Sequence, residues 1–304
     1  MTAQMKLGEL KTTLNAVILA HNYQAGEVQD AADYVGDSLD LSRRAAETDA
    51  DVIVFCGVHF MAETAAILSP KKTVIMPDLD AGCPMADMIT AVELRAAKAE
   101  HPDATVVTYV NSSAEVKAES DWCCTSANAV GIVAATGADQ ILFTPDKYLG
   151  AYVQSKFPGK EFILWNGWCP THARIMPEDI AARRAEHPGA PVMVHPECRP
   201  ETIAAADEVL STGGMIRFAR ETDAQVIIVG TEVGIIHRLQ KENPGKEFYP
   251  VTELAVCPNM KKTDLAKVVS VLEEYSAGDT SHVIKVRGDI AARARKAIDR
   301  MLSV

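Results

Sequence analysis

The stretch Asp51-Val-Ile-Val-Phe-Cys56, followed by Gly82-Cys83-Pro84, has two close counterparts further along the chain. These are Asp139-Gln-Ile-Leu-Phe-Thr144 with Trp168-Cys169-Pro170, and Gln225-Val-Ile-Ile-Val-Gly230 with Val256-Cys257-Pro258. Cys169 follows Cys83 by 86 residues, and Cys257 follows Cys169 by 88. Repeated strand–helix units alone would explain the apolar runs. They would not place every Cys-Pro pair at the same phase, so the chain contains three copies of one unit.

Two further sets of residues recur with the same period. Apolar runs at 15–20, 104–108 and 190–194 lead into the triplets His21-Asn22-Tyr23, Tyr109-Val110-Asn111 and His195-Pro196-Glu197. A hydroxyl residue lies 17 positions after the first residue of each triplet; these residues are Ser38, Ser126 and Thr212. The strand-end triplets, the hydroxyl residues and the Cys-Pro pairs occur in the same order in each copy, which strengthens the evidence for a repeat.

The repeat predicts the fold. Each copy reads as strand, helix, strand, helix, strand, with Ala-rich helical segments such as 39–47, 127–135 and 214–221. We therefore expect an α/β protein of three pseudo-threefold-related, three-layer αβα units, with short parallel sheets around a central site. The predicted units are 1–100, 101–186 and 187–263. The tail 264–304, with two helical segments and a possible short strand at 282–286, is expected to pack on the first unit.

Composition narrows the class of protein. The 304 residues are 48% hydrophobic and 23% charged, with a net charge of −11, and no basic cluster suggests a nucleic-acid partner. The basic run Arg293, Arg295, Lys296 is expected to be a solvated helix face. No apolar run is long enough to cross a membrane, and residues 1–10 do not resemble a secretory signal, so a cytoplasmic location is expected. Glycine-rich nucleotide loops and a nucleophile elbow are absent from the sequence.

Seven cysteines in a cytoplasmic chain favour metal binding or catalysis over disulfides. Cys83, Cys169 and Cys257, one per unit, can bind three irons of a four-iron cluster and leave the fourth iron open. A zinc ion with three thiolates and a water is the alternative. The remaining cysteines do not follow the repeat as thiols and are expected to be packing residues; they are Cys56, Cys123, Cys124 and Cys198.

The other landmarks have two interpretations each. Function in parallel α/β sheets gathers at the carboxyl ends of strands, where the triplets and hydroxyls lie. His21, Tyr23, Tyr109, His195 and Glu197 are therefore candidate acid–base groups, although a histidine at a strand end is often structural. Ser38, Ser126 and Thr212 precede apparent helices and fit either simple N-capping or anion binding. Thr212-Gly213-Gly214 is the strongest anion candidate, because glycine lets an anion approach the backbone.

The motifs together resemble the quinolinate synthase family. They are His21-Asn22-Tyr23-Gln24, Asp37-Ser38-Leu39, Phe55-Cys56-Gly57-Val58-His59-Phe60-Met61-Ala62-Glu63-Thr64, Cys83-Pro84-Met85-Ala86, Tyr109-Val110-Asn111-Ser112, Cys169-Pro170-Thr171-His172, His195-Pro196-Glu197-Cys198, Ser211-Thr212-Gly213-Gly214-Met215 and Cys257-Pro258-Asn259-Met260-Lys261. The resemblance implies condensation of iminoaspartate with dihydroxyacetone phosphate to quinolinate, phosphate and water in NAD biosynthesis. It also implies a [4Fe–4S] cluster and three pseudo-symmetric domains.

The resemblance also implies roles for individual residues. Cys83, Cys169 and Cys257 would be the cluster ligands, Tyr23 with His21 a proton-handling pair, and Glu197 with His195 the base that isomerises the condensed intermediate. Tyr109 and Asn111 would orient substrate, and Ser38, Ser126 and Thr212 would contact carboxylates or phosphate. His172 is a weaker candidate. Met260 stands where some longer members have a further cysteine, which argues against a thiol switch here.

Two other functions remain as alternatives. One is an iron–sulfur hydro-lyase that acts on another small hydroxyacid. The other is a cluster-dependent sensor or scaffold, which the absence of a basic face in the sequence disfavours. For the leading function, an aspartate-oxidising enzyme is the expected supplier of iminoaspartate, and the only other partners expected are the small-molecule substrates.

Overall fold

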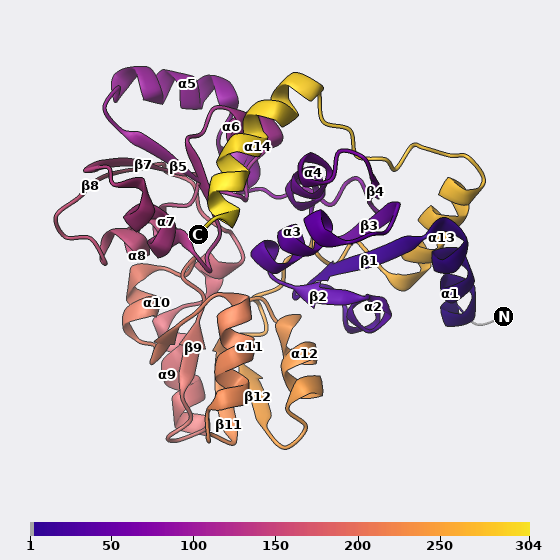
Figure 1. The fold of residues 1–304 in the computed structure, drawn as a ribbon. Helices are drawn as coiled ribbons and strands as arrows, with labels where there is room; N and C mark the ends of the chain where they lie inside the picture. Colours follow the sequence, from indigo (N-terminus) through magenta and orange to yellow (C-terminus); the bar gives the residue numbers. More distant parts are fainter. Residues whose placement is uncertain (1–2) are drawn as a thin grey trace.

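The computed structural model describes residues 3–304, which form three similar α/β units around a common centre (Figure 1). Each unit contains one four-stranded parallel sheet, and the strand orders are β2-β1-β3-β4, β6-β5-β7-β8 and β10-β9-β11-β12. The same connectivity therefore occurs three times, with helices on the faces of each sheet. This confirms the predicted fold class of three αβα units with short parallel sheets.

The first unit begins the chain. Its sheet consists of β1 (Ala16–His21), β2 (Tyr34–Gly36), β3 (Val52–Cys56) and β4 (Thr73–Ile75). Its helices are α1 (Ala3–Leu14), α2 (Gly26–Ala31), α3 (Ser38–Glu47) and α4 (His59–Leu68), followed by the 3₁₀ turn η1 (Ala86–Met88).

The second and third units repeat this plan. The second contains α5 (Ala91–Glu100), β5 (Thr105–Tyr109), α6 (Ala114–Ala118), β6 (Trp122–Cys124), α7 (Ala129–Thr136), β7 (Gln140–Thr144), α8 (Lys147–Gln154), β8 (Glu161–Leu164) and the 3₁₀ turn η2 (His172–Arg174). The third contains α9 (Pro177–Glu186), β9 (Val192–Val194), α10 (Pro200–Ala204), β10 (Glu208–Val209), α11 (Thr212–Glu221), β11 (Val226–Gly230), α12 (Ile235–Glu242) and β12 (Glu247–Pro250).

The central strands form the core of each unit. Every residue of β3 is buried, and β1, β5, β7, β9 and β11 are buried over most or all of their length. Strands covered by helices on both faces need apolar side chains on both sides, which explains the continuous β-branched runs in the sequence.

Each sheet has one strand more than the sequence predicted. The extra edge strands β2, β6 and β10 have only two or three residues, too few to give a periodic pattern. An aspartate precedes each of them, and its carboxylate accepts a hydrogen bond from a central-strand amide. The three bonds run from Ile18 to Asp33 (2.8 Å), from Val106 to Asp121 (2.9 Å) and from Val192 to Asp207 (2.7 Å). These aspartates tie the start of each edge strand to its neighbour.

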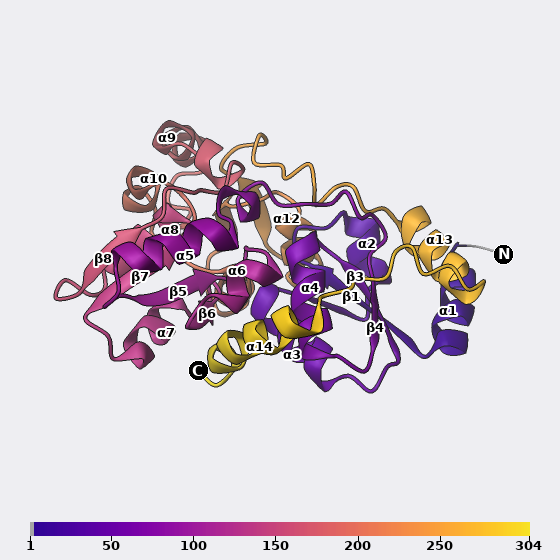
Figure 2. The same cartoon turned by 90° about the horizontal axis from the view of Figure 1, so that it is seen from above.

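The C-terminal tail is divided between two places. Helix α13 (Leu265–Ser276) packs beside α1 on the first unit, whereas α14 (Gly288–Leu302) lies along α6 and β6 of the second unit and also contacts α4 (Figures 1 and 2). The predicted strand at 282–286 is instead a single antiparallel bridge between Ile75 and Val283. The tail thus joins the first two units.

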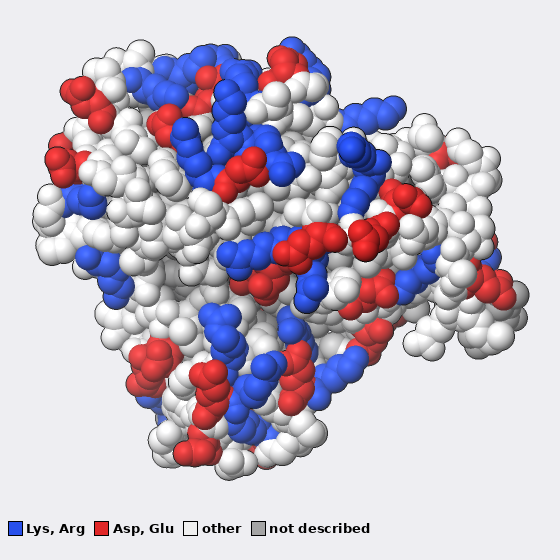
Figure 3. Space-filling model, viewed as in Figure 1, with Lys and Arg blue, Asp and Glu red and all other residues white. Residues whose placement is uncertain are grey.

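Charged side chains on α14 are largely paired with acidic neighbours. Arg293 pairs with Glu119 at 2.9 Å and Arg295 with Asp299 at 2.6 Å. On the face drawn in Figure 3, basic side chains with a few acidic ones among them cover the region of α5 and α14, and Arg293 and Lys296 are exposed, as the sequence predicted for a solvated helix face. Within residues 3–304, none of the helices has the length and apolar character that crossing a membrane requires.

The aspartate bond to the central strand gives a prediction for stability. Asp121 is the cleanest test, because Asp33 and Asp207 also form ion pairs with Lys11 and Arg184. We expect Asp121→Ala to lower the free energy of unfolding by about 1–3 kcal/mol, since a hydrogen bond to a charged acceptor is lost. Urea denaturation measures the change. The exposed Asp103→Ala is the control and should shift stability by less than about 0.5 kcal/mol; equal losses in both variants would contradict the proposed role of Asp121.

Candidate active site and metal centre

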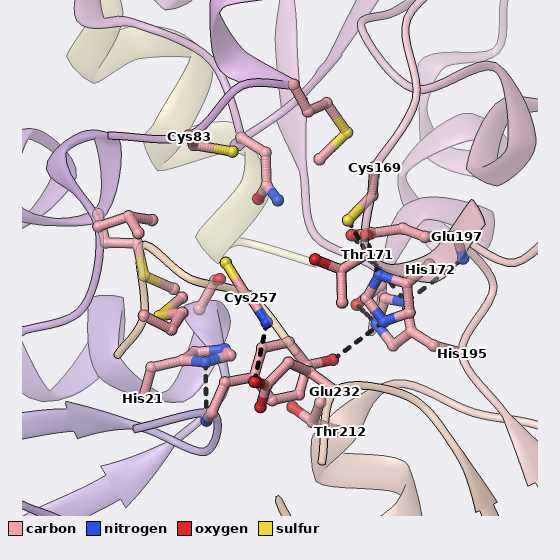
Figure 4. A pocket seen from close by; sticks show the side chains of 18 of the residues that line it. His21, Cys83, Cys169, Thr171, His172, His195, Glu197, Thr212, Glu232 and Cys257 are labelled. Atoms are coloured by element: carbon pink, nitrogen blue, oxygen red, sulfur yellow. Dashed lines mark hydrogen bonds and ion pairs between the residues drawn. The ribbon is translucent and has the colours of Figure 1, made fainter. Parts of the chain in front are cut away.

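The carboxyl ends of the central strands of all three units face one cavity at the centre of the molecule (Figure 4). The twelve leading candidate side chains from the sequence line this cavity, as does the weaker candidate His172, and they come from all three units. The twelve are His21, Tyr23, Ser38, Cys83, Tyr109, Asn111, Ser126, Cys169, His195, Glu197, Thr212 and Cys257. The repeat thus brings its strand-end residues, hydroxyls and thiols to a single place.

The same backbone hydrogen bond holds the cysteine loop in each unit. The amide three residues after β3, β7 or β11 donates to the carbonyl two residues before the cysteine. The three pairs are His59 to Ala81 (2.8 Å), Lys147 to Gly167 (2.9 Å) and Val233 to Ala255 (3.0 Å). Each cysteine is therefore anchored to the carboxyl end of a buried strand of its own unit.

The three thiols are suited to bind a metal. Their sulfur atoms point into the same central space in Figure 4 and form no disulfides. Backbone amides near each sulfur lower the thiol pKa against the effect of burial: those of Met85 and Ala86 at Cys83, that of His172 at Cys169, and those of Asn259 and Met260 at Cys257. Amides directed at cysteine sulfurs are among the features that tune thiolate-bound iron–sulfur centres. The donor set therefore fits a thiolate-bound metal.

Burial keeps these thiols protonated when no cation is present. It raises the pKa of Cys83 to about 12 and also raises the pKa values of Cys169 and Cys257. A metal that binds here must displace the protons, so binding releases acid. The remaining four cysteines, Cys56, Cys123, Cys124 and Cys198, lie in the hydrophobic cores, as the sequence indicated.

A second group of possible metal ligands overlaps the first. The nearest ligand atoms of Cys169, His172 and Glu197 all lie within 4.8 Å of one another. His172, the weaker candidate from sequence, is fully inside this site: its Nδ1 is 2.8 Å from Glu197 Oε2 and 3.2 Å from Cys169 Sγ. The carboxylate is thus close enough to the thiols for chemistry at a bound metal to reach it.

Two histidines have a fixed tautomer. The backbone amide of Tyr23 donates to His21 Nδ1 (3.2 Å), and that of Glu197 donates to His195 Nδ1 (3.3 Å). Burial lowers the pKa of each ring to about 3, against partial opposition from Glu197. Each ring is therefore neutral near pH 7 and carries its proton on Nε2. His195 Nε2 faces Ser126 Oγ at 3.1 Å, so it acts as a hydrogen-bond donor in the cavity.

Glu197 is a buried carboxylate with donors from the second unit. Tyr109 donates its hydroxyl proton to Oε1, and His172 donates from Nδ1 to Oε2. Burial alone would raise the pKa of Glu197, but His172 and His195 outweigh burial and hold the pKa below its usual value. Burial and Glu197 together raise the pKa of Tyr109. Glu197 is therefore an anion and Tyr109 a neutral donor at neutral pH.

A chain of hydrogen bonds continues from His172 to Tyr23. The Thr231 hydroxyl lies 2.8 Å from His172 Nε2 and 2.6 Å from the Tyr23 hydroxyl. In the tautomer in which His172 donates from Nδ1 to Glu197 and accepts at Nε2, Thr231 donates to His172 and Tyr23 donates to Thr231. Burial raises the pKa of Tyr23, so it keeps its proton. The chain connects Tyr23, from the first unit, with Thr231 and Glu197, from the third, and His172, from the second, lies between those two.

The observed helix caps rule out simple N-capping by Ser38 and Thr212. The caps of α3 and α11 are Asp37 and Ser211, one residue before Ser38 and Thr212, so these hydroxyls are not the caps. Polar groups also face the glycine amides beside Thr212: Gly214 donates to Ser211 at 3.1 Å, and the Gly213 amide lowers the pKa of the nearby Asp37 carboxyl. Thr212 accepts from Asn22 at 3.0 Å. An anion in the cavity would thus meet side-chain hydroxyls rather than free backbone amides.

Sequence reasoning missed two functional candidates on the loop after β11. Thr231 and Glu232 are the first and second residues after that strand, and Glu232 lines the cavity. At the same phase the first two units have Gly57-Val58 and Pro145-Asp146. Thr231 has no counterpart of its type, and Glu232 is matched by an acid only in the second unit, so the repeat gave a weak signal at best; their position just after a buried strand was the other clue.

The buried histidines predict acid sensitivity of the metal-free protein. Unfolded His21 binds a proton near pH 6.5, whereas folded His21 does so only near pH 3. The unfolded state therefore binds more protons as the pH falls below 6.5, and stability is lost down to about pH 3. Between pH 7 and 5, His21→Gln should lose about 2 kcal/mol less stability than the parent. Denaturation at both pH values checks this, with the partly exposed His101→Gln as control; an unchanged pH dependence in His21→Gln would contradict the assignment.

Comparison with known proteins agrees with this geometry. Residues 5–303 match the family described as Quinolinate synthetase A protein. The chain is 58% identical to a quinolinate synthase of Dehalococcoides mccartyi strain CBDB1 over 98% of this chain and 97% of the relative. It is 55% identical to that of Thermodesulfovibrio yellowstonii (97% and 96% covered) and 54% identical to that of Methanoregula boonei (99% and 98% covered). Full-length matches of this strength show that the chain belongs to the quinolinate synthase family of enzymes.

Proposed function

We propose that this enzyme condenses iminoaspartate with dihydroxyacetone phosphate to give quinolinate, phosphate and water, as a step of NAD biosynthesis. The observation that carries the proposal is the cavity itself, where three thiols, a carboxylate and two tyrosines from three units converge. The reaction forms a pyridine ring and requires loss of water and several proton transfers. A buried site with a fixed base and fixed donors suits that chemistry.

The proposed cofactor is a [4Fe–4S] cluster on Cys83, Cys169 and Cys257. When bound, it would supply a Lewis-acidic iron that favours loss of a hydroxyl group. The support is the donor set, with three partly buried thiols that line one cavity and have backbone amides near their sulfur atoms. A zinc ion with three thiolates remains the alternative, and metal analysis of the purified protein separates the two.

The proposed base is Glu197. It is the anionic group in the cavity that lies between Tyr109 and His172, and both keep it oriented. A proton taken by Glu197 can be shared with His172 and Thr231, because each group is within hydrogen-bond distance of the next. Tyr23, at the other end of this chain, is the proposed acid, with His21 beside it as a neutral donor.

The proposed substrate contacts surround these groups. Ser38, Ser126 and Thr212 offer hydroxyls to carboxylates or phosphate, and His195 donates from Nε2 on the same side as Ser126. Asn111 lines the cavity with a buried side-chain oxygen that has no hydrogen-bond partner among the described residues. A buried amide oxygen without a partner is costly, so a substrate donor such as a hydroxyl or amine is its natural complement.

The substrate also implies a supplier. Iminoaspartate is an unstable imine, so we propose that an aspartate-oxidising enzyme provides it, in the cytoplasm where the product enters NAD biosynthesis. The other partners in the proposal are small molecules alone.

A product assay tests the proposed reaction. Anaerobically prepared, iron-loaded protein is supplied with iminoaspartate and dihydroxyacetone phosphate, and the pyridine dicarboxylate is measured by chromatography. We expect quinolinate and stoichiometric phosphate. An intact cluster without any pyridine product would favour the alternative, a hydro-lyase for another small hydroxyacid.

Single substitutions separate cofactor binding from proton transfer. Cys83→Ala should lose most bound iron and all turnover, because one of three thiolates is removed. Tyr23→Phe and Glu197→Gln should retain iron but lose roughly 10²–10⁴-fold in kcat, the range of acid–base catalysis. Iron analysis, visible absorption and turnover are compared in the same preparations, with Cys56→Ala as the control cysteine that should retain iron. Unchanged turnover in both Tyr23→Phe and Glu197→Gln would falsify these roles.

A further inference from the structure

A carboxylate outside the proposed reaction holds the Cys257 loop. Glu232 is completely buried, and its Oε1 accepts the backbone amide of Cys257 at 3.0 Å. Its Oε2 accepts the amide of Gly234 at 2.7 Å. The Glu232 side chain thus ties the loop after β11 to the loop that carries the third thiol, as the dashed line from Cys257 in Figure 4 shows.

Lys261 completes this arrangement and extends it to the first unit. Its ammonium lies 2.9 Å from Glu232 Oε1 and 3.1 Å from Oε2, and it also donates to the backbone carbonyl of Tyr23. Because a buried carboxylate needs both a counter-charge and hydrogen-bond donors, Lys261 fixes Glu232 at the same time as it holds Tyr23. Glu232 and Lys261 are called the clasp below.

Tyr23 is therefore attached to the third unit at two points. Its hydroxyl bonds to Thr231, and its carbonyl bonds to Lys261 of the clasp. Thr231 and Glu232 are adjacent in the chain, so one short loop contacts both the tyrosine and the cysteine loop. The space around the ammonium is tight: a Cβ added at Gly234 would lie 2.6 Å from Lys261 Nζ and 2.7 Å from the Tyr23 carbonyl oxygen.

The other units have no equivalent clasp. Val58 and Asp146 occupy the place of Glu232, and Asp87 and Ala173 stand four residues after their cysteines, where the third unit has Lys261. Asp146 is also a buried carboxylate and accepts the amide two residues on, as Glu232 does, but Ala173 takes the place of its lysine. The lysine and its bond to Tyr23 are thus properties of the third unit and not of the repeat.

We propose that Glu232 and Lys261 are positioning residues that couple the Cys257 loop to Tyr23, so that order in one segment requires order in the other. The inference rests on the proposed function only in giving Cys257 the part of a ligand and Tyr23 that of an acid. The clasp touches neither substrate nor metal in this proposal; it sets where the thiol and the tyrosine stand.

Hydrogen–deuterium exchange of the metal-free protein tests the coupling without any reaction. Lys261→Met keeps the hydrocarbon stem and removes the charge. We expect exchange in residues 22–26 and in 256–261 to rise together by about tenfold, because breaking a buried pair favours local opening. Gly234→Ala is the second variant: it keeps every group of the clasp but wedges them apart, and it should loosen the same two segments.

Two controls locate the effect. Lys262→Met removes the neighbouring lysine, which bonds to the Asp80 carbonyl, and should leave residues 22–26 unchanged. Asp146→Asn alters the matching position of the second unit and should affect its own loop but not residues 22–26. Thermal melting identifies any variant that is globally unfolded, and Gly234→Ala then decides. Wild-type exchange at 22–26 in a folded clasp variant would overturn the proposal.

Loaded protein provides an independent second readout. In Lys261→Met a chelator should remove iron from the loaded protein several-fold faster than from the parent. The value of kcat should also fall about tenfold or more with KM nearly unchanged, because Tyr23 is displaced while the substrate contacts remain. A proportional rise in KM with normal kcat would contradict positioning of Tyr23. If no quinolinate forms in any variant, the proposed function fails, but the exchange result still decides on the coupling.

Discussion

The buried negative charge of Glu197 is the constraint around which the molecule is assembled. An ionised carboxylate away from water is costly unless donors surround it. Here the donors Tyr109 and His172 come from the second unit, and the carboxylate comes from the third. Neither unit can satisfy this charge alone, so the two must close on each other. His172 passes the contact on through Thr231 to Tyr23 of the first unit, and the same set of bonds therefore holds all three units at the centre.

The same burial also gives each titratable group of the cavity one stable protonation state. Burial lowers the pKa values of His21 and His195 to about 3 and raises that of Tyr23, while Glu197 remains charged. Each group thus has one dominant form near neutral pH. Backbone amides at the Nδ1 atoms then orient the histidine protons toward the cavity. The hydrogen-bond donors are set before any ligand arrives, which is the condition for electrostatic preorganisation.

Much of the fold and of the candidate site could be predicted from the sequence, because the repeat shows which positions in the three units correspond. The phase of the strand-end triplets placed His21 and Tyr109 at corresponding ends of buried strands, and parallel sheets gather such ends. The phase of the Cys-Pro pairs placed Cys83 in the same kind of loop as Cys169 and Cys257. The repeat could not predict features that differ between the three units. Thr231 has no counterpart of its type, and Glu232 has an acidic counterpart, Asp146, only in the second unit. The edge strands are too short to show a period, and the caps Asp37 and Ser211 lie only one residue from the hydroxyls that a capping pattern suggested.

The features that the three units share and the features in which they differ have different roles at the cavity. Three thiols held by the same backbone bond form a nearly symmetric set, which by itself favours no direction across the cavity. The asymmetry of the cavity comes from the positions at which the three units have different residues. His21 and Tyr23, Tyr109 and Asn111, and His195 and Glu197 occupy equivalent places, yet they supply a neutral imidazole with a phenol, a phenol with an amide, and a neutral imidazole with an anion. The cavity is therefore chemically different on its three sides. Symmetry in this fold suits the binding of a metal, and the loss of symmetry around it suits the binding of an asymmetric substrate.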